Sequence, residues 1–121
     1  MGKEYLIDTN TVVFYFDNKL PHRVNAIIEN GAINISVITR MELMSWSGAT
    51  KPQVDVIKEF IKKAVVHNLE EAVILKAIEI RKKKRMKLPD AIIAATAITR
   101  DIILVTNDGT NSKVTEATCR K

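Results

Sequence analysis

The feature of the chain that most constrains its fold is a regular alternation of short apolar runs with longer helical segments. Runs rich in β-branched residues occupy 4–8 (EYLID), 32–36 (AINIS), 64–68 (AVVHN) and 102–106 (IILVT). Continuous apolar runs are typical of strands buried on both faces, and strands that alternate with helices form a parallel sheet covered by helices on both faces. We therefore predict an α/β fold with a parallel sheet of about five strands, the fifth being a weak candidate in 113–118 (KVTEAT).

Residues with known capping preferences mark the helix boundaries between these runs. Gly31 is a stop signal for the second helical segment, and Thr50 with Gln53 forms a capping-box pattern. Asn68 opens an Asn-x-x-Glu start signal for the next helix, and Pro89 fits the first turn of the one after it. These signals predict where each helix starts or stops relative to its neighbouring strand.

Length and composition indicate the class of protein. A chain of 121 residues suits one domain, spanning 1–121, with its own core, and 46% hydrophobic residues exclude a disordered chain. The net charge of +5 suits a polyanionic partner. Cys119 is the single cysteine, so no internal disulfide can form and a reducing compartment fits. No apolar stretch is long enough to span a membrane and no signal-peptide pattern is present, so we expect a cytoplasmic protein without membrane contact.

Four acidic residues fall where the predicted topology brings distant segments together. Right-handed crossovers place the carboxyl ends of parallel strands at one edge of the sheet, where ligands bind. Asp8 follows the first strand and Asp108 follows the fourth, whereas Glu42 lies about two turns into the helix after the second strand. Asp90 is in the first turn of the helix that leads into the fourth strand. All four carboxylates are therefore expected at one edge.

Each of these acids also has an ordinary structural explanation. Asp8 and Asp90 are favourable helix-start residues, Glu42 could face solvent, and Asp108 begins an Asp-Gly turn pattern. Their joint placement points to a site, because clustered carboxylates repel unless one is protonated or a cation joins them. Oxygen ligands without His or Cys suit Mg²⁺ or Mn²⁺.

Four segments, taken together, resemble a known family. YLIDTN (5–10), TRMELM (39–44), KLPDAIIAATA (87–97) and LVTND (104–108) are similar, in order and spacing, to PIN-domain ribonucleases, in particular to the VapC-type toxins of toxin–antitoxin pairs. The resemblance implies a PIN-like domain that hydrolyses RNA phosphodiester bonds with Mg²⁺ or Mn²⁺. It also implies a homodimer and a VapB-type antitoxin as protein partner. The tail after Asp108 lacks the aromatic residue usual in the family.

The resemblance assigns roles to individual residues. The family's acidic positions, which bind metal and carry catalysis, correspond to Asp8, Glu42, Asp90 and Asp108. Thr106 matches a small hydroxyl residue near the site, and Asn10 matches the polar residue that follows the first aspartate. In such a site the metal would activate water and offset charge on the phosphate.

A run of cations has two explanations of equal weight. It could guide an RNA backbone into the site, or it could be a solvated helix end matched to the helix dipole. The residues concerned are Arg81, Lys82, Lys83, Lys84, Arg85 and Lys87. Aromatic residues make up 5% of the chain and stand mostly in apolar runs, so base stacking is not indicated.

Two alternatives to the ribonuclease stay open on sequence alone. One is a PIN-fold module that binds RNA or protein without catalysis. The other is a receiver-like Mg²⁺-binding signalling domain, which requires paired acids near the first strand and a lysine after the last strand. Asp8 stands alone after its strand and Lys113 is a poor match for that lysine, so the receiver-like alternative fits less well.

Overall fold

A computed structural model describes residues 4–107 and 112–115 of the chain, with side chains described for 4–106. Five strands and six helices follow one another within these residues. The strands are β1 (Glu4–Ile7), β2 (Ala32–Ser36), β3 (Val65–His67), β4 (Ile103–Asn107) and β5 (Ser112–Thr115). The helices are α1 (Thr9–Phe16), α2 (His22–Asn30), α3 (Val37–Met44), α4 (Lys51–Lys63), α5 (Glu71–Lys83) and α6 (Leu88–Arg100).

The sheet has the strand order β3-β2-β1-β4-β5. The first four strands run parallel, as predicted, and β1 lies at the centre between β2 and β4. The fifth strand forms but is antiparallel to β4, with Leu104 opposite Thr115. Only residues 108–111 separate the two strands, whereas a parallel connection needs a crossover of about a dozen residues. The expectation of a parallel sheet is therefore correct for four strands and wrong for the direction of the fifth.

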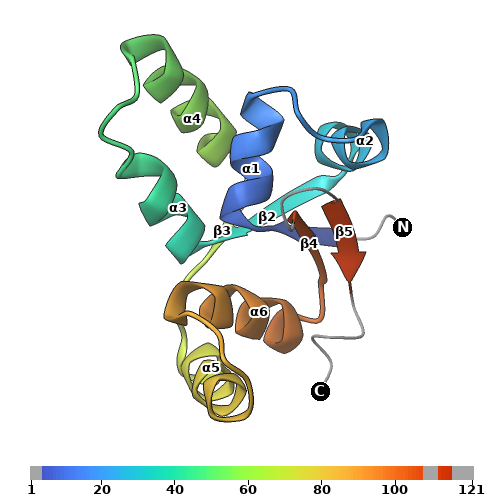
Figure 1. The fold of residues 1–121 in the computed structure, drawn as a ribbon, viewed down its shortest axis with the longest axis vertical. Coiled ribbons are helices and arrows are strands. Elements are labelled where there is room, and N and C mark those ends of the chain that lie inside the picture. The colour runs from blue at the N-terminus through green and yellow to red at the C-terminus, as the bar shows by residue number, and fades with distance from the viewer. Residues whose placement is uncertain (1–3, 108–111, 116–121) are drawn as a thin grey trace.

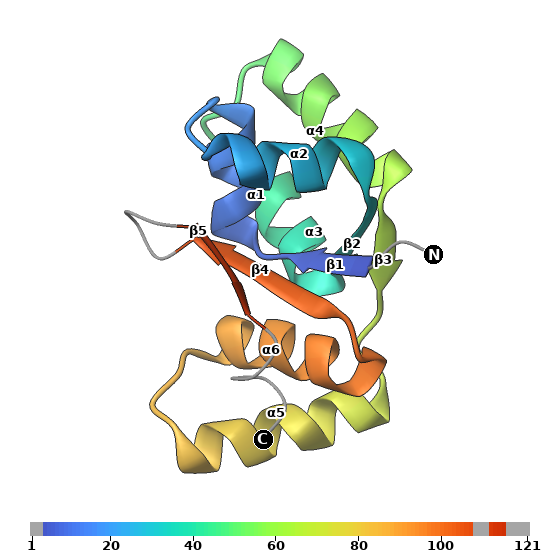
Figure 2. The ribbon, with the colours of Figure 1, turned by 90° about the vertical axis from the view of Figure 1, so that its right-hand side faces the viewer.

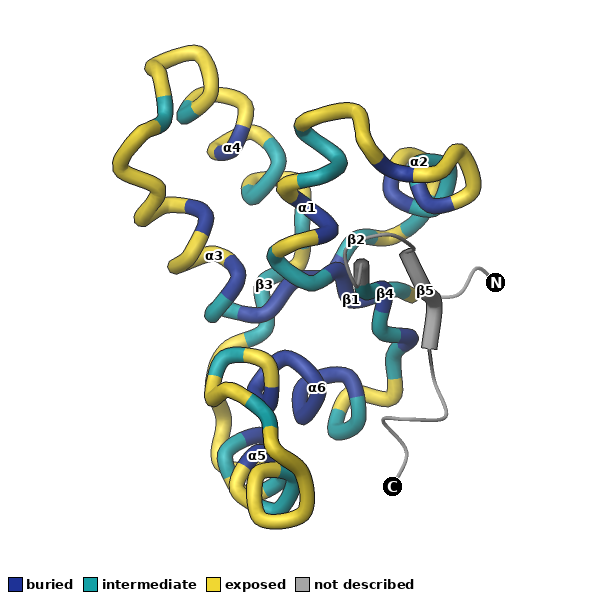
Figure 3. Tube along the Cα trace, viewed as in Figure 1, coloured by how far each residue is buried: buried dark blue, intermediate teal, exposed yellow. Residues whose placement is uncertain are grey.

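Helices cover both faces of the sheet. Helices α1 to α4 lie on one side and α5 and α6 on the other, with α6 between the sheet and α5 (Figures 1 and 2). The alternation of side chains along β1 serves both layers: Ile7 packs with Val12 and Ile35 under the first layer, whereas Leu6 packs with Ile93 under α6. Figure 3 shows the burial concentrated in the sheet and in α6.

Helix α6 is the most deeply buried helix among the described residues. Every residue of α6 from 91 to 97 is buried. Buried residues of α6 pack against Val73 and Ala77 of α5. The small alanine side chains within 91–97 let α5 and the sheet pack close to α6 from both sides. At the start of this apolar helix Asp90 is exposed, so the buried part begins one residue after the acid.

The predicted helix boundaries hold with one exception. The capping box of Thr50 and Gln53 is present, and Gly31 ends α2 where a Cβ would come within 2.8 Å of the Ile27 carbonyl oxygen. The Asn68 start signal was wrong: α5 begins at Glu71, with Glu70 at its N-cap and no side-chain cap. The Asn68 carbonyl instead accepts a hydrogen bond from the Glu70 amide, which makes 68–70 a turn before the helix. Within the described residues, no helix is both long and apolar enough to cross a membrane.

Candidate functional site

Asp8 occupies the junction between the central strand and the first helix. It is the N-cap of α1, and its Oδ1 accepts a hydrogen bond from the Thr11 amide at 2.9 Å. Its Oδ2 accepts a second hydrogen bond, from the Thr106 hydroxyl of β4 at 2.5 Å. The capping explanation is therefore correct for Asp8, and its role in a site stays a prediction. The cap fixes one oxygen, and the neighbouring strand fixes the other.

The surroundings of Asp8 disfavour its negative charge. Burial raises the pKa of the Asp8 carboxyl above its ordinary value, and the hydrogen bonds from Thr106 and Thr11 oppose this increase. The negative charge of Asp90 raises the pKa further, so the start of α6 lies close enough to act on the end of β1. Figure 2 shows the carboxyl ends of β1 and β4 and the start of α6 on the same side of the molecule.

Glu42 is connected to this site through a hydroxyl group. The Thr9 hydroxyl donates to Glu42 Oε1 at 2.6 Å, and it lies 2.9 Å from the hydroxyl of Thr39. Thr9 has one hydroxyl proton and an ionised carboxylate can only accept. Thr39, which is buried, must therefore donate to Thr9. The result is a chain of hydrogen bonds from Thr39 through Thr9 to Glu42, and Thr9 directly follows Asp8 in the sequence.

We call Asp8, Glu42 and Asp90, with the hydroxyls of Thr9 and Thr106, the acidic edge. The atoms that it could offer as ligands to a metal ion are all oxygens, which fits Mg²⁺ or Mn²⁺. No three His, Cys, Asp or Glu residues among those described are arranged closely enough to hold a metal ion. Mg²⁺ commonly keeps several waters and binds through one or two carboxylates, so this looser arrangement is compatible with it. Asp108, the fourth predicted acid, lies outside the described residues.

The two predicted supporting residues differ in position. Thr106 contacts Asp8 directly, as its proposed role near the site requires. Asn10 lies in the first turn of α1 and is exposed. Thr9 was missed by sequence reasoning, although it directly follows Asp8. Its hydrogen-bond partners lie 30 and 33 residues away, and no local pattern signals such a contact.

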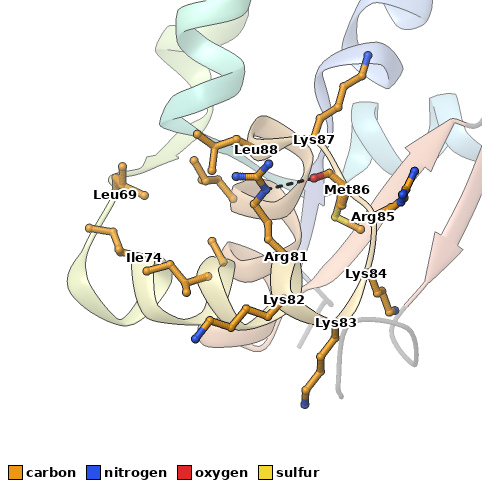
Figure 4. A pocket seen from close by; sticks show the side chains of 13 residues that line it. Leu69, Ile74, Arg81, Lys82, Lys83, Lys84, Arg85, Met86, Lys87 and Leu88 are labelled. Atoms are coloured by element: carbon orange, nitrogen blue, oxygen red, sulfur yellow. Dashed lines mark hydrogen bonds between the residues drawn. The ribbon is translucent and has the colours of Figure 1, made fainter.

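The cationic run lines a surface that the acidic edge does not share. Arg81, Lys82 and Lys83 form the last turn of α5, and the remaining cations belong to the connection to α6. All six line a groove of about 1080 Å³ between the two helices (Figure 4), which we call the cationic groove. None of the acids of the acidic edge lines it.

His67 has a structural role at the end of β3. Its Nε2 lies 2.8 Å from Oδ1 of Asn34, a buried residue of the neighbouring strand. Burial lowers the pKa of the His67 imidazole, and the positive charge of Arg100 lowers it further.

Comparisons with known proteins agree with the fold and the segments described above. The family model of the PIN domain matches residues 5–116. A toxin–antitoxin complex from Klebsiella pneumoniae is 29% identical over 88% of each chain, with a TM-score of 0.71. DNA-bound VapBC from Salmonella typhimurium is 26% identical over 85% of this chain and 83% of its own, with a TM-score of 0.69.

More distant structures share the fold alone. VapBC2 from Rickettsia felis, bound to a promoter DNA fragment, is 22% identical over 87% of each chain with a TM-score of 0.72. No curated protein matches the chain at a significant level. The resemblance inferred from the four sequence segments is thus confirmed by a match to the family model that spans all four.

Proposed function

The chain belongs to the PIN-domain family, and we propose that it is a metal-dependent endoribonuclease that serves as the toxin of a VapBC-type pair. The observation that most supports this is the arrangement around Asp8. One of its oxygens accepts a hydrogen bond from the Thr11 amide of the following helix and the other from the distant Thr106 hydroxyl, and a second carboxylate, Asp90, lies within electrostatic reach. A carboxylate that is partly buried beside another is a typical cation-binding arrangement.

In this proposal the acids hold Mg²⁺ or Mn²⁺ and the hydroxyls orient the acids. Asp8, Glu42 and Asp90 would bind the metal together with Asp108, and the bound ion would activate water and offset charge on the phosphate. Thr106 and the Thr11 amide fix the rotation of the Asp8 carboxylate, and Thr9 does the same for one oxygen of Glu42. Orienting the ligands beforehand reduces the reorganisation needed when metal and substrate bind.

The proposed substrate is RNA in the cytoplasm. The chain carries a net charge of +5, which favours encounter with a polyanion. The bare carboxylates of the acidic edge would repel phosphates, so RNA binding and metal binding should be coupled.

The proposal includes a VapB-type antitoxin and a second copy of the chain as partners. Two structural relatives more than 25% identical are toxin–antitoxin complexes. A groove of about 680 Å³ beside α1 and α4 is lined in part by Tyr15, Phe16 and Phe60, whose rings pack against one another. Aromatic side chains of this kind are enriched in protein interfaces, which makes this groove our candidate surface for the antitoxin.

The test is cleavage of structured RNAs by the purified protein in Mg²⁺ or Mn²⁺, with and without EDTA. Asp8→Asn should lose activity, whereas Asp55→Asn should retain it, because Asp55 is an exposed acid on α4 paired only with Lys51 among the described residues. Cleavage that survives chelation would overturn the metal-dependent mechanism. RNA binding without any cleavage would favour the non-catalytic PIN module instead, an alternative suggested by the loose arrangement of the acids.

A further inference from the structure

The cationic groove has a composition unlike that of any other surface described. Thirteen side chains line it, six of them cationic and seven apolar, and the lining contains no acidic or uncharged polar side chain. The apolar members are Leu69, Ile74, Ala77, Ile78, Met86, Leu88 and Ile92. Figure 4 shows Leu69 and Ile74 at one end of the groove and the cationic side chains around the rest of it.

The apolar part of the groove is open to solvent. Ile78 is 47% exposed, Leu88 51% and Leu69 43%. Ala77 and Ile92, which line the same groove, are buried. Exposed apolar side chains gathered in a concave surface with a polar rim mark a site of interaction rather than random surface exposure.

The rim of the groove carries more positive charge than is needed to compensate the dipole at the carboxyl end of α5. The carboxyl end of a helix carries a dipole equivalent to about half a negative charge, against six cationic side chains here. One of them, Lys83, is paired with Glu79 at 3.6 Å, and Arg81 donates to the uncharged carbonyl of Met86 at 3.3 Å. The groove therefore presents a net positive field over an apolar floor.

We propose that the cationic groove binds an acidic amphipathic peptide segment of a partner protein. The apolar side chains of the segment would contact Ile78 and Leu88, and its carboxylates would pair with cations such as Lys82. This is the helix-in-groove mode of recognition combined with charge complementarity. It goes beyond the ribonuclease activity and uses a different surface from the groove beside α1 and α4.

Three features favour a peptide over other polyanions. The groove contains no aromatic side chain on which bases could stack. Seven apolar side chains would face sugars and phosphates if RNA were bound, whereas they match Leu or Ile side chains of a peptide. The groove is also hollowed between two helices (Figure 4), a shape that fits a peptide helix rather than a flat lipid surface.

The experiment selects ligands without assuming their sequence. A phage-displayed library of random 16-residue peptides is panned against the full chain, and the selected peptides are labelled with fluorescein for anisotropy titrations. We expect selected sequences to be enriched in both acidic and large apolar residues. Ile78→Asp and, separately, Lys82→Glu should weaken their binding at least tenfold.

The matched control is Leu75→Asp. Leu75 lies on the same helix and is 57% exposed, but it does not line the groove. It introduces the same side chain into α5 and should change peptide affinity by less than twofold. Thermal melting of all three variants shows whether they are folded, and Lys82→Glu keeps the test valid if Ile78→Asp is unstable, because it alters no apolar packing.

Two results would overturn the proposal. The first is selection of peptides without acidic enrichment, or peptides that bind Ile78→Asp as tightly as the parent. The second concerns a single-stranded RNA oligonucleotide whose affinity is measured in EDTA. If Ile78→Asp lowers the affinity for this RNA tenfold and leaves the affinity for the peptides unchanged, the groove is an RNA channel. Neither result depends on whether the chain cleaves RNA, so the proposal is independent of the ribonuclease assay.

Discussion

The acidic edge and the cationic groove lie on either side of the start of α6, but they are built in opposite ways. The groove is formed largely by one contiguous stretch, 81–88, with two helices folded against each other. The acidic edge is assembled from contacts between residues 33 and 98 positions apart. One region is therefore mainly a property of local sequence and the other of the tertiary fold.

This difference predicts how each region responds to mutation. In the acidic edge the side chains of Asp8 and Glu42 accept hydrogen bonds from Thr106 and Thr9, so a single change disturbs the partner as well. In the groove the cations are exposed and act through their summed charge, so neutralising one of them should have a small and graded effect on RNA cleavage and on stability. The four predictions below test this contrast, from the largest expected effect to the smallest.

The largest effect is expected for RNA cleavage. Asp8→Asn should reduce kcat/KM by about 100-fold or more, because loss of one charged ligand misplaces the metal and a shift of about 1 Å can cost that much. Lys82→Gln in the groove should leave kcat unchanged and alter KM by no more than a few-fold. Initial rates on a labelled RNA, fitted for both parameters, give the answer. Equal losses for the two variants would contradict the contrast between the regions.

A second effect of about tenfold is expected at Thr9. Thr9→Val keeps the shape of the side chain but removes the hydroxyl that connects Thr39 to Glu42, so Glu42 should lose its fixed orientation. Cleavage should fall and the Mn²⁺ concentration needed for half-maximal thermal stabilisation should rise. Thr9→Ser restores the hydroxyl and should recover most of both. If Ser and Val behave alike, the hydroxyl chain does not position Glu42.

Much of the fold could be predicted from sequence because its signals are local. Continuous apolar runs identified four strands, and the capping box at Thr50 identified the start of α4. The direction of β5 was missed because it depends on the length of the connection after β4 rather than on the residues in the strand. The Asn68 start signal was wrong because Asn68, although able to cap a helix, lies in a turn two residues before the actual N-cap, Glu70.

The candidate site was predictable only in part. The positions of Asp8 and Asp90 followed from topology, since strand ends and helix starts meet at one edge of a parallel sheet. The supporting roles of Thr9 and Thr39 did not follow, because a hydroxyl group in a sequence gives no indication of the distant group that it contacts. Nor could the sequence show that the cations of 81–87 line a groove that Asp90 does not line, because residues 81–90 are contiguous in the chain.

A smaller effect is expected on stability rather than activity, and it comes from the cost of keeping the partly buried Asp8 carboxylate charged, to which Asp90 adds. The pKa of Asp8 is raised in the folded protein, so the fold holds its proton to higher pH than the unfolded chain does. The associated stability is present below the unfolded pKa of about 3.8 and is lost as pH rises through the folded pKa. Asp8→Asn cannot ionise and should melt above the parent at pH 7 in EDTA.

The same comparison contains its own controls. Near pH 3.5 the difference between parent and Asp8→Asn should shrink, because both side chains are then largely neutral. At pH 7, Mg²⁺ should raise the melting temperature of the parent through binding to the folded state and raise that of Asp8→Asn less. A variant that melts below the parent in EDTA at every pH would show that Asp8 stabilises the fold as a cap and that its buried charge costs less stability than the cap contributes.

The smallest effect is expected for stability in the groove. Lys84→Gln removes one of six neighbouring positive charges and no apolar contact, so it should change the free energy of unfolding by less than about 0.5 kcal/mol, the usual range for exposed positions. Any change should be towards greater stability, because repulsion among the cations decreases, and it should vanish in 1 M salt, where the screening length is about 3 Å. Urea melts at low and high salt measure both quantities. A loss of 1 kcal/mol or more would mean that Lys84 makes a specific structural contact, and the groove would then resemble the acidic edge in being an interlocked part of the fold rather than an accumulation of charge on its surface.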